Sequence, residues 1–397
     1  MSFLKKIVNI NIWNFVYSFF SFLSNLLIGR FLGVEVFAEF SVISVYVSLT
    51  SLVMIFIPPY VATFKYQDEE NFKEIYFIYY CCFSVITIFF NFISWLYLRS
   101  TISIQLLCLV FYSFGSIWFN YIDVTLQSQG KLRKYFVILA FSSVVKVLVL
   151  LVLCFFNRID NINDLLFSFG VAQFLMLIYI WKNDPVAKFS LLLKVKDIRI
   201  YLVLNVKNYK SYYLNTALKR LQDQIGILMF SFTSSKETLG IFSLLIKSLS
   251  FIVSLIRPIE AYFINRENLQ NDYNKILNKS IFLGVFCQLV FIPFSVLYLY
   301  LMTNRLNYIP VVIISFYFLF YITSTLIRAK YFSTYEIKVI NLNQIIYICS
   351  IVTSSLVVYF FDLVVINGLT FIYLIANVIF QLNMIYLYKK KTNEKIN

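Results

Sequence analysis

Apolar residues fill this chain in long runs, separated by short segments rich in charge or Asn. Runs of about 20 residues recur about a dozen times, and a helix of that length crosses a bilayer core. A run such as VKVLVLLVLCFF has no polar side, which suits lipid better than a half-solvated surface. The pattern predicts an all-α polytopic membrane protein with spans at 8–29, 38–58, 75–98, 102–126, 135–156, 164–181, 212–232, 239–257, 280–302, 308–327, 338–360 and 364–388.

Composition supports this prediction and excludes several activities. Of the 397 residues, 60% are hydrophobic and only 13% charged, too few charges to solvate so much apolar surface in a soluble domain. His is absent, so no Ser-His-Asp hydrolase or His-ligated metal site can be built. The six Cys have no metal-type spacing, and no GxxxxGK motif for nucleotide is present. We therefore expect no cofactor, no metal and no enzymatic activity.

The basic residues predict the orientation. If both termini are cytoplasmic, the inside loops collect 24 of the 34 Lys and Arg. The outside loops then hold five: Arg30, Arg99, Arg158, Lys236 and Arg305. We expect a bacterial inner-membrane protein with both ends inside. The net charge of +15 is a topology signal, and because it forms no single patch we expect no nucleic acid partner.

The longest interior break divides the spans into two sets of six. We predict a six-helix half at 1–182, a basic cytoplasmic linker at 183–211, and a second half with a cytoplasmic tail at 212–397. Part of the linker has an apolar helical face suited to the membrane interface. The halves share a weak pattern of helix exit, turn, Phe-Ser and terminal Pro, as in transporters built from parallel repeats.

Polar residues form helical stripes within several spans. They include Asn25 in the first span and Asn215, Lys219 and Asp223 in the seventh, with Arg220 one residue off the stripe. Polar residues in membrane helices either line a route for substrate or serve as interhelical hydrogen-bonding glue. Both interpretations stay open for the Asn and Ser stripes.

Five cations lie inside spans: Lys146, Lys219, Arg220, Lys247 and Arg257. Only three acids accompany them, Asp123, Asp223 and Glu260. An excess of positive charge in a membrane cavity favours an anion, and diphosphate suits both Lys and Arg. The alternatives are structural ion pairing, such as Lys219 with Asp223 four residues later, and misplaced span boundaries.

Three segments carry a family resemblance. LIGRFLGVEVFAEFSVIS resembles the end of the first helix and the start of the second in bacterial polysaccharide exporters. QSQGKLRKYFVILA resembles the loop between their fourth and fifth helices, and RLQDQIGILMFSFTSSKETLGIFSLLIKSLSFIVSLIRPIEAY their seventh and eighth. The resemblance covers the whole layout and points to the O-antigen flippase branch of the multidrug/oligosaccharidyl-lipid/polysaccharide (MOP) superfamily. One departure is Phe-Ala-Glu-Phe in the first turn, where a Gly usually stands.

The resemblance implies transport of an undecaprenyl-diphosphate-linked oligosaccharide from the cytoplasmic to the periplasmic leaflet by alternating access. The expected diphosphate and sugar contacts are Lys146, Lys219, Arg220, Lys247, Arg257, Asn25 and Asn215. Asp223 and Asp123 are candidates for a coupling proton or cation, although Asp223 can equally neutralise Lys219. Further expected partners are membrane lipids and the polymerase and chain-length regulator of the same pathway.

Two rival functions remain. A drug or cation extruder of the same superfamily has this layout, but its substrates favour an acidic cavity, whereas the intramembrane balance here is basic. An O-antigen polymerase is an enzyme of similar hydropathy and is expected to carry a large outside loop with Arg residues. The predicted outside breaks are all short, which disfavours the polymerase.

Overall fold

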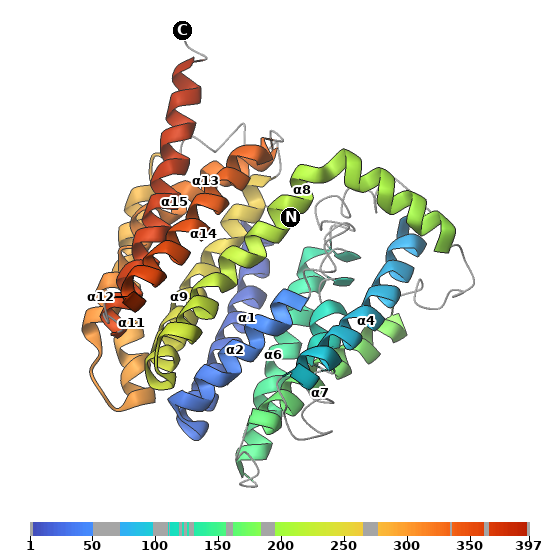
Figure 1. Ribbon diagram of the computed structural model, residues 1–397, viewed down its shortest axis with the longest axis horizontal. Helices are drawn as coiled ribbons and strands as arrows, with labels where there is room; N and C mark the ends of the chain where they lie inside the picture. Colours follow the sequence, from blue (N-terminus) through green and yellow to red (C-terminus); the bar gives the residue numbers. More distant parts are fainter. Residues whose placement is uncertain are drawn as a thin grey trace. The chain divides into compact units, whose positions relative to one another are not determined.

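The computed structural model describes residues 3–50, 72–97, 110, 112–118, 121–122, 125–126, 131–155, 162–183, 195–264, 277–333, 336–360 and 365–394. Every labelled element in this part of the chain is a helix (Figure 1). The helices are α1 (Phe3–Leu32), α2 (Val34–Thr50), α4 (Phe72–Tyr97), α6 (Leu132–Phe155), α7 (Ile162–Asn183), α8 (Val195–Thr233), α9 (Lys236–Ile264), α11 (Ser280–Thr303), α12 (Tyr308–Ser315), α13 (Phe318–Ser333), α14 (Ile337–Phe360) and α15 (Ile366–Glu394).

The all-helical membrane fold predicted from the sequence is confirmed. In the described residues, 8 segments are long and apolar enough to cross a membrane. They are Ile12–Leu32, Phe72–Phe89, Arg133–Phe155, Lys236–Ile256, Ser280–Thr303, Tyr308–Tyr331, Ile337–Phe360 and Ile366–Lys390, and each overlaps an expected span. Helices also occupy the described parts of the four other expected spans.

The seventh expected span is the second part of a much longer helix. α8 has 39 residues and is continuous from Val195, inside the predicted linker, to Thr233. At 1.5 Å per residue such a helix is about 58 Å long, nearly twice the hydrocarbon thickness. The described end of the linker is therefore helical and extends the span. Linker residues 184–194 lie outside the described residues.

The chain forms two compact units. One contains Met1–Leu27 and Ile43–Arg220, and the other contains Ile28–Val42 and Leu221–Asn397. The second, C-terminal unit thus includes the end of α1 and the start of α2, two elements from the beginning of the chain. The division into halves at 1–182 and 212–397 was based on span count and stays a prediction.

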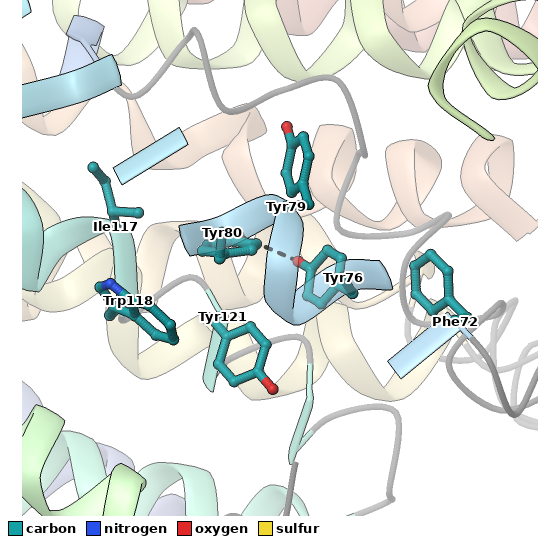
Figure 2. Close-up of a cluster of buried hydrophobic side chains, with 7 residues drawn as sticks. All are labelled: Phe72, Tyr76, Tyr79, Tyr80, Ile117, Trp118 and Tyr121. Atoms are coloured by element: carbon teal, nitrogen blue, oxygen red, sulfur yellow. Dashed lines mark hydrogen bonds between the residues drawn. The ribbon is translucent and has the colours of Figure 1, made fainter. Parts of the chain in front are cut away.

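Buried aromatic rings form a core in the first, N-terminal unit. Figure 2 shows Phe72, Tyr76, Tyr79 and Tyr80 of α4 beside Ile117, Trp118 and Tyr121. The Tyr76 hydroxyl donates to the Tyr80 hydroxyl at 3.2 Å, and the Tyr76 and Tyr121 rings stack with centroids 5.7 Å apart. Tyr76 and Tyr79 are 0% exposed. These tyrosines therefore stack on one another, and their faces are not open to a sugar.

Three of the basic residues expected on one side of the membrane meet at one end of the C-terminal unit. Arg30 donates to the Asn304 side chain and the Leu301 carbonyl, both at 3.3 Å. Arg305 pairs with Glu237 at 3.1 Å, and Lys236 pairs with Glu39. Gly33 allows the sharp turn between α1 and α2, because its φ of 85° is one that other residues rarely adopt. The turn between α1 and α2 therefore lies beside these polar contacts.

The tenth expected span is broken, although its apolar pattern predicts one continuous helix. α12 ends at Ser315, and the Phe316 and Tyr317 amides donate to carbonyls only three residues earlier, at 3.4 and 3.0 Å. Such tightening frees carbonyl groups, which need a partner in a membrane. Gln381 of α15 supplies one by donating to the Tyr317 carbonyl at 3.3 Å. The break is thus stabilised by a residue distant in sequence, which an apolar pattern cannot reveal.

Replacing Gln381 with Leu is expected to destabilise the protein by about 1–3 kcal/mol, because the Tyr317 carbonyl loses its donor in a buried, water-poor site. The measurement is thermal unfolding of the purified protein in detergent. Gln288→Leu is the matched control: Gln288 donates to Ser315, whose hydroxyl also donates to the Val312 carbonyl, so little is left unsatisfied. Equal stability losses in both variants would contradict this account of the break.

Candidate functional site

Lys247 of α9 is a half-buried cation near the middle of the span Lys236–Ile256. Within the described part of the chain its ammonium makes no hydrogen bond, ion pair or ring contact. Ser243, one turn earlier, is 0% exposed, and its hydroxyl also lacks a partner among the described residues. An ionised lysine in a membrane span is costly unless it faces a polar cavity or a ligand. Lys247 is therefore the strongest anion-binding candidate in the C-terminal unit.

Lys146 lies near the middle of α6 in the N-terminal unit, and its surroundings define the Lys146 cluster: Ser142, Lys146, Phe169, Gln173 and Tyr112. The ammonium sits 5.1 Å from the centre of the Phe169 ring, a cation–π distance. The rings of Phe169 and Tyr112 meet edge to face at 6.0 Å. An aromatic face offsets part of the cost of burying this charge and leaves the ammonium positive.

The Lys146 cluster also contains buried polar atoms without a partner in the described residues. These are the Ser142 hydroxyl and the Gln173 side-chain oxygen, in residues 1% and 5% exposed. A Cβ added to Gly115 would collide with the Gln173 side chain, so the helical segment at 112–118 approaches α7 closely here. Unsatisfied polar groups in a membrane span are expensive, which makes the Lys146 cluster a candidate for holding a polar ligand or water.

The other sequence-predicted site residues are placed as follows. Asn25 donates to the Ser21 carbonyl of its own helix at 2.9 Å, a bond that neither joins two helices nor involves a substrate. Asn215 is buried on α8, while Lys219 and Arg220 follow on the same helix and are half-buried. Asn25, Lys146, Asn215, Lys219 and Arg220 all belong to the N-terminal unit. Asp223 and Lys247 belong to the C-terminal unit, as does Arg257, whose backbone lies in α9.

Two predicted site residues lie wholly or partly outside the described part of the chain. Asp123 lies outside the described residues, so its proposed coupling role stays a prediction. The Arg257 side chain also lies outside them.

Asp223 of α8 is exposed and adjoins a polar group that defines the Asp223 cluster: Asp223, Tyr347, Tyr373 and Asn377. The side chains of Tyr347, Tyr373 and Asn377 hydrogen-bond to one another, and Asp223 lies close enough to act electrostatically on both tyrosines. Tyr347 and Asn377 are 1% and 6% exposed. An accessible carboxylate beside two buried polar side chains and the half-buried Tyr373 is a candidate site for a proton or a small cation.

Sequence reasoning missed the partners in both clusters. In the last span Tyr373, Asn377 and Gln381 recur every four residues, a polar stripe as regular as the one predicted in the seventh span. That stripe is recognisable from its spacing, but it carries no charge. The sequence prediction selected charged residues as the site and therefore did not include it. Phe169 and Tyr112 carry no comparable signal, because aromatic residues are common throughout the chain.

Comparison of the fold with solved structures gives matches over nearly the whole chain. A multidrug resistance MATE family transporter of the MOP superfamily in its inward-facing conformation matches with a TM-score of 0.69 and 10% identity, over 96% of each chain. The lipid II flippase MurJ in an inward closed conformation matches with a TM-score of 0.72 and 14% identity, over 96% of this chain and 87% of the flippase. This chain has the fold of the MOP superfamily transporters.

A third match carries a description of its binding pocket. A MOP superfamily transporter from Pyrococcus furiosus matches with a TM-score of 0.62 and 11% identity, over 98% of this chain and 96% of that one; it is described as having a binding pocket whose reverse polarity suggests a different function. No protein-family model matches the sequence, and no curated protein matches it. The MOP fold and its several spans make the chain a multi-pass membrane protein.

Proposed function

We propose that this protein is a flippase that moves an undecaprenyl-diphosphate-linked oligosaccharide, the O-antigen repeat unit, from the cytoplasmic to the periplasmic leaflet of a bacterial inner membrane. Both termini are cytoplasmic in this proposal, and transport proceeds by alternating access. The lipid tail stays in the bilayer while the charged, sugar-bearing head needs a polar route. The polymerase and chain-length regulator of the same pathway are the proposed protein partners.

The observation that carries the proposal is Lys247, a half-buried cation in a membrane span without a partner among the described residues. In a drug extruder of this fold, such a positive charge would repel a cationic substrate. A diphosphate attracts it, since its anionic oxygens can accept charge-assisted hydrogen bonds from an ammonium group. Lys146, Lys219, Arg220 and Arg257 are the further proposed diphosphate contacts, and Asn25 and Asn215 the proposed sugar contacts.

The test is deletion of the gene in its own bacterium, with complementation by the wild-type gene. The expected result is loss of long surface polysaccharide and accumulation of undecaprenyl-linked repeat units accessible only from the cytoplasmic leaflet. Single units reaching the surface without long chains would indicate a polymerase. An unchanged surface with altered drug tolerance would indicate an extruder.

Asp223→Asn is expected to remove coupling to an ion gradient, because the amide keeps the shape of the side chain but binds neither a proton nor a cation comparably. In proteoliposomes loaded with lipid-linked oligosaccharide, we expect the gradient-driven rate to fall at least about tenfold. Binding of the substrate should be unchanged, because Asp223 is not a proposed diphosphate contact.

Glu237→Gln is the matched control, because it neutralises an exposed carboxylate of the same unit whose ion pair among the described residues is with Arg305 at the surface. It should transport at the wild-type rate. If Asp223→Asn transported at the full gradient-driven rate, Asp223 would not be the coupling residue and its role would be structural.

A further inference from the structure

One end of α13, α14 and α15 carries a concentration of positive charge that the proposed transport route does not use. Its members, named here the basic end, are Lys330 in the last turn of α13, Lys338 in the first turn of α14, and Lys389 and Lys390 near the end of α15. The three helices pack side by side in the C-terminal unit (Figure 1). Glu336 is the one carboxylate among the described residues between Lys330 and Lys338.

Contacts between the helices bring these lysines to the same level. Asn383 of α15 donates to Asn343 of α14, and further along the same pair the rings of Tyr347 and Phe380 lie 6.2 Å apart. This antiparallel register places Lys338, five residues before Asn343, level with Tyr388, five residues after Asn383. The Lys330 ammonium donates to the Tyr388 hydroxyl at 2.9 Å, which fixes α13 at that level too.

Below the lysines, the same helix faces are apolar and exposed. On α15, Leu382, Tyr386 and Lys390 follow at intervals of four residues, and the first two are 44% and 62% exposed. On α14, Leu342 and Ile345 continue the exposed face that begins with Lys338 and are 53% and 41% exposed. Apolar residues, then Tyr, then Lys is the order expected where a helix leaves the hydrocarbon and reaches the headgroups.

We propose that the basic end binds the phosphate of an anionic phospholipid of the bilayer. Lys338, Lys389 and Lys390 are exposed, so their ammonium groups can reach a headgroup, while Lys330 is held by Tyr388 at the centre of the site. The exposed apolar faces beneath them accommodate the acyl chains. These apolar faces favour a lipid over a free phosphate ion, because acyl chains can pack against them and an ion cannot. The ligand is bulk phospholipid, so the inference is independent of the transported substrate.

The test measures lipid binding by the full-length protein in detergent, by native mass spectrometry, with phosphatidylglycerol, phosphatidylcholine or inorganic phosphate added. A Lys near a charged membrane surface contributes about 1 kcal/mol, so the triple variant Lys338→Gln/Lys389→Gln/Lys390→Gln should bind phosphatidylglycerol at least about tenfold more weakly. Phosphatidylcholine should bind weakly to both proteins, and inorganic phosphate should not displace phosphatidylglycerol.

Two further variants make the outcome decisive. Arg133→Gln/Lys134→Gln/Lys279→Gln removes the same number of charges from exposed positions elsewhere and should bind phosphatidylglycerol as the wild type does. Lys338→Arg/Lys389→Arg/Lys390→Arg keeps the charge and should retain binding. Equal weakening in both Gln variants, equal binding of phosphatidylcholine, or displacement by inorganic phosphate would overturn the proposal.

Discussion

Replacing Lys247 with Met is expected to make the protein more stable and to abolish transport. The stability gain follows because the half-buried ammonium has no partner in the described structure, and a Lys at the centre of a membrane helix costs about 2.5–3.5 kcal/mol. Met fills a similar volume without a charge. The transport loss follows because the proposed diphosphate contact disappears, and we expect at least about a tenfold lower rate.

Thermal unfolding in detergent and export of lipid-linked oligosaccharide in the deletion strain measure the two effects separately. Lys279→Met is the control, because Lys279 is exposed before α11, and both measurements should stay at wild-type values. Normal export by Lys247→Met would remove the main support for the flippase proposal. A loss of stability would mean that Lys247 is paired within the protein.

Gly240→Ala is expected to prevent correct folding of the C-terminal unit. A Cβ at Gly240 would overlap the Val34 carbonyl oxygen and lie 2.9 Å from the carbonyl carbon. Both atoms are backbone at the start of α2, so whole helices must shift, at a cost of about 3 kcal/mol or more. The expected readout is a marked loss of monodisperse protein after extraction from the membrane.

Gly226→Ala provides the comparison. A Cβ at Gly226 would meet only the Tyr373 ring, at 3.4 and 3.6 Å, and Ala favours the helix by about 1 kcal/mol over Gly. We expect a yield at or above that of the wild type. Similar yields for both variants would show that the approach of Val34 to α9 is not needed for folding.

The fold was largely predictable because long apolar runs in a sequence identify membrane-spanning helices. The end of α1 at Leu32 follows from Gly33, which the sequence marks clearly. The break at Phe316–Tyr317 was not predictable, since no Gly or Pro lies there and its carbonyl is satisfied by Gln381, 64 residues away. The long α8 was also missed, because the charges of the linker resemble those of a loop.

For the candidate site, the sequence predicts which residues matter but not what surrounds them. The rule that intramembrane charges are costly identified Lys146, Lys247 and Asp223 as candidates from the sequence. Their surroundings differ for reasons that spacing does not reveal: Lys146 lies over Phe169, whereas Asp223 adjoins two tyrosines from α14 and α15. Contacts between distant helices decide these differences. A single helical stripe carries no information about them.

The C-terminal unit is completed by residues that are synthesised long before the rest of it. Phe37 and Ala38 are fully buried in it, and Glu39 pairs with Lys236, 197 residues later in the chain. At synthesis rates of about 5–20 residues per second, the start of α2 precedes α9 by roughly 10–40 seconds. During that interval Val34 has no Gly240 to lie against, and Glu39 has no Lys236 to pair with. Newly made protein therefore passes through a stage in which lipid, the translocation machinery or a chaperone must cover this early segment.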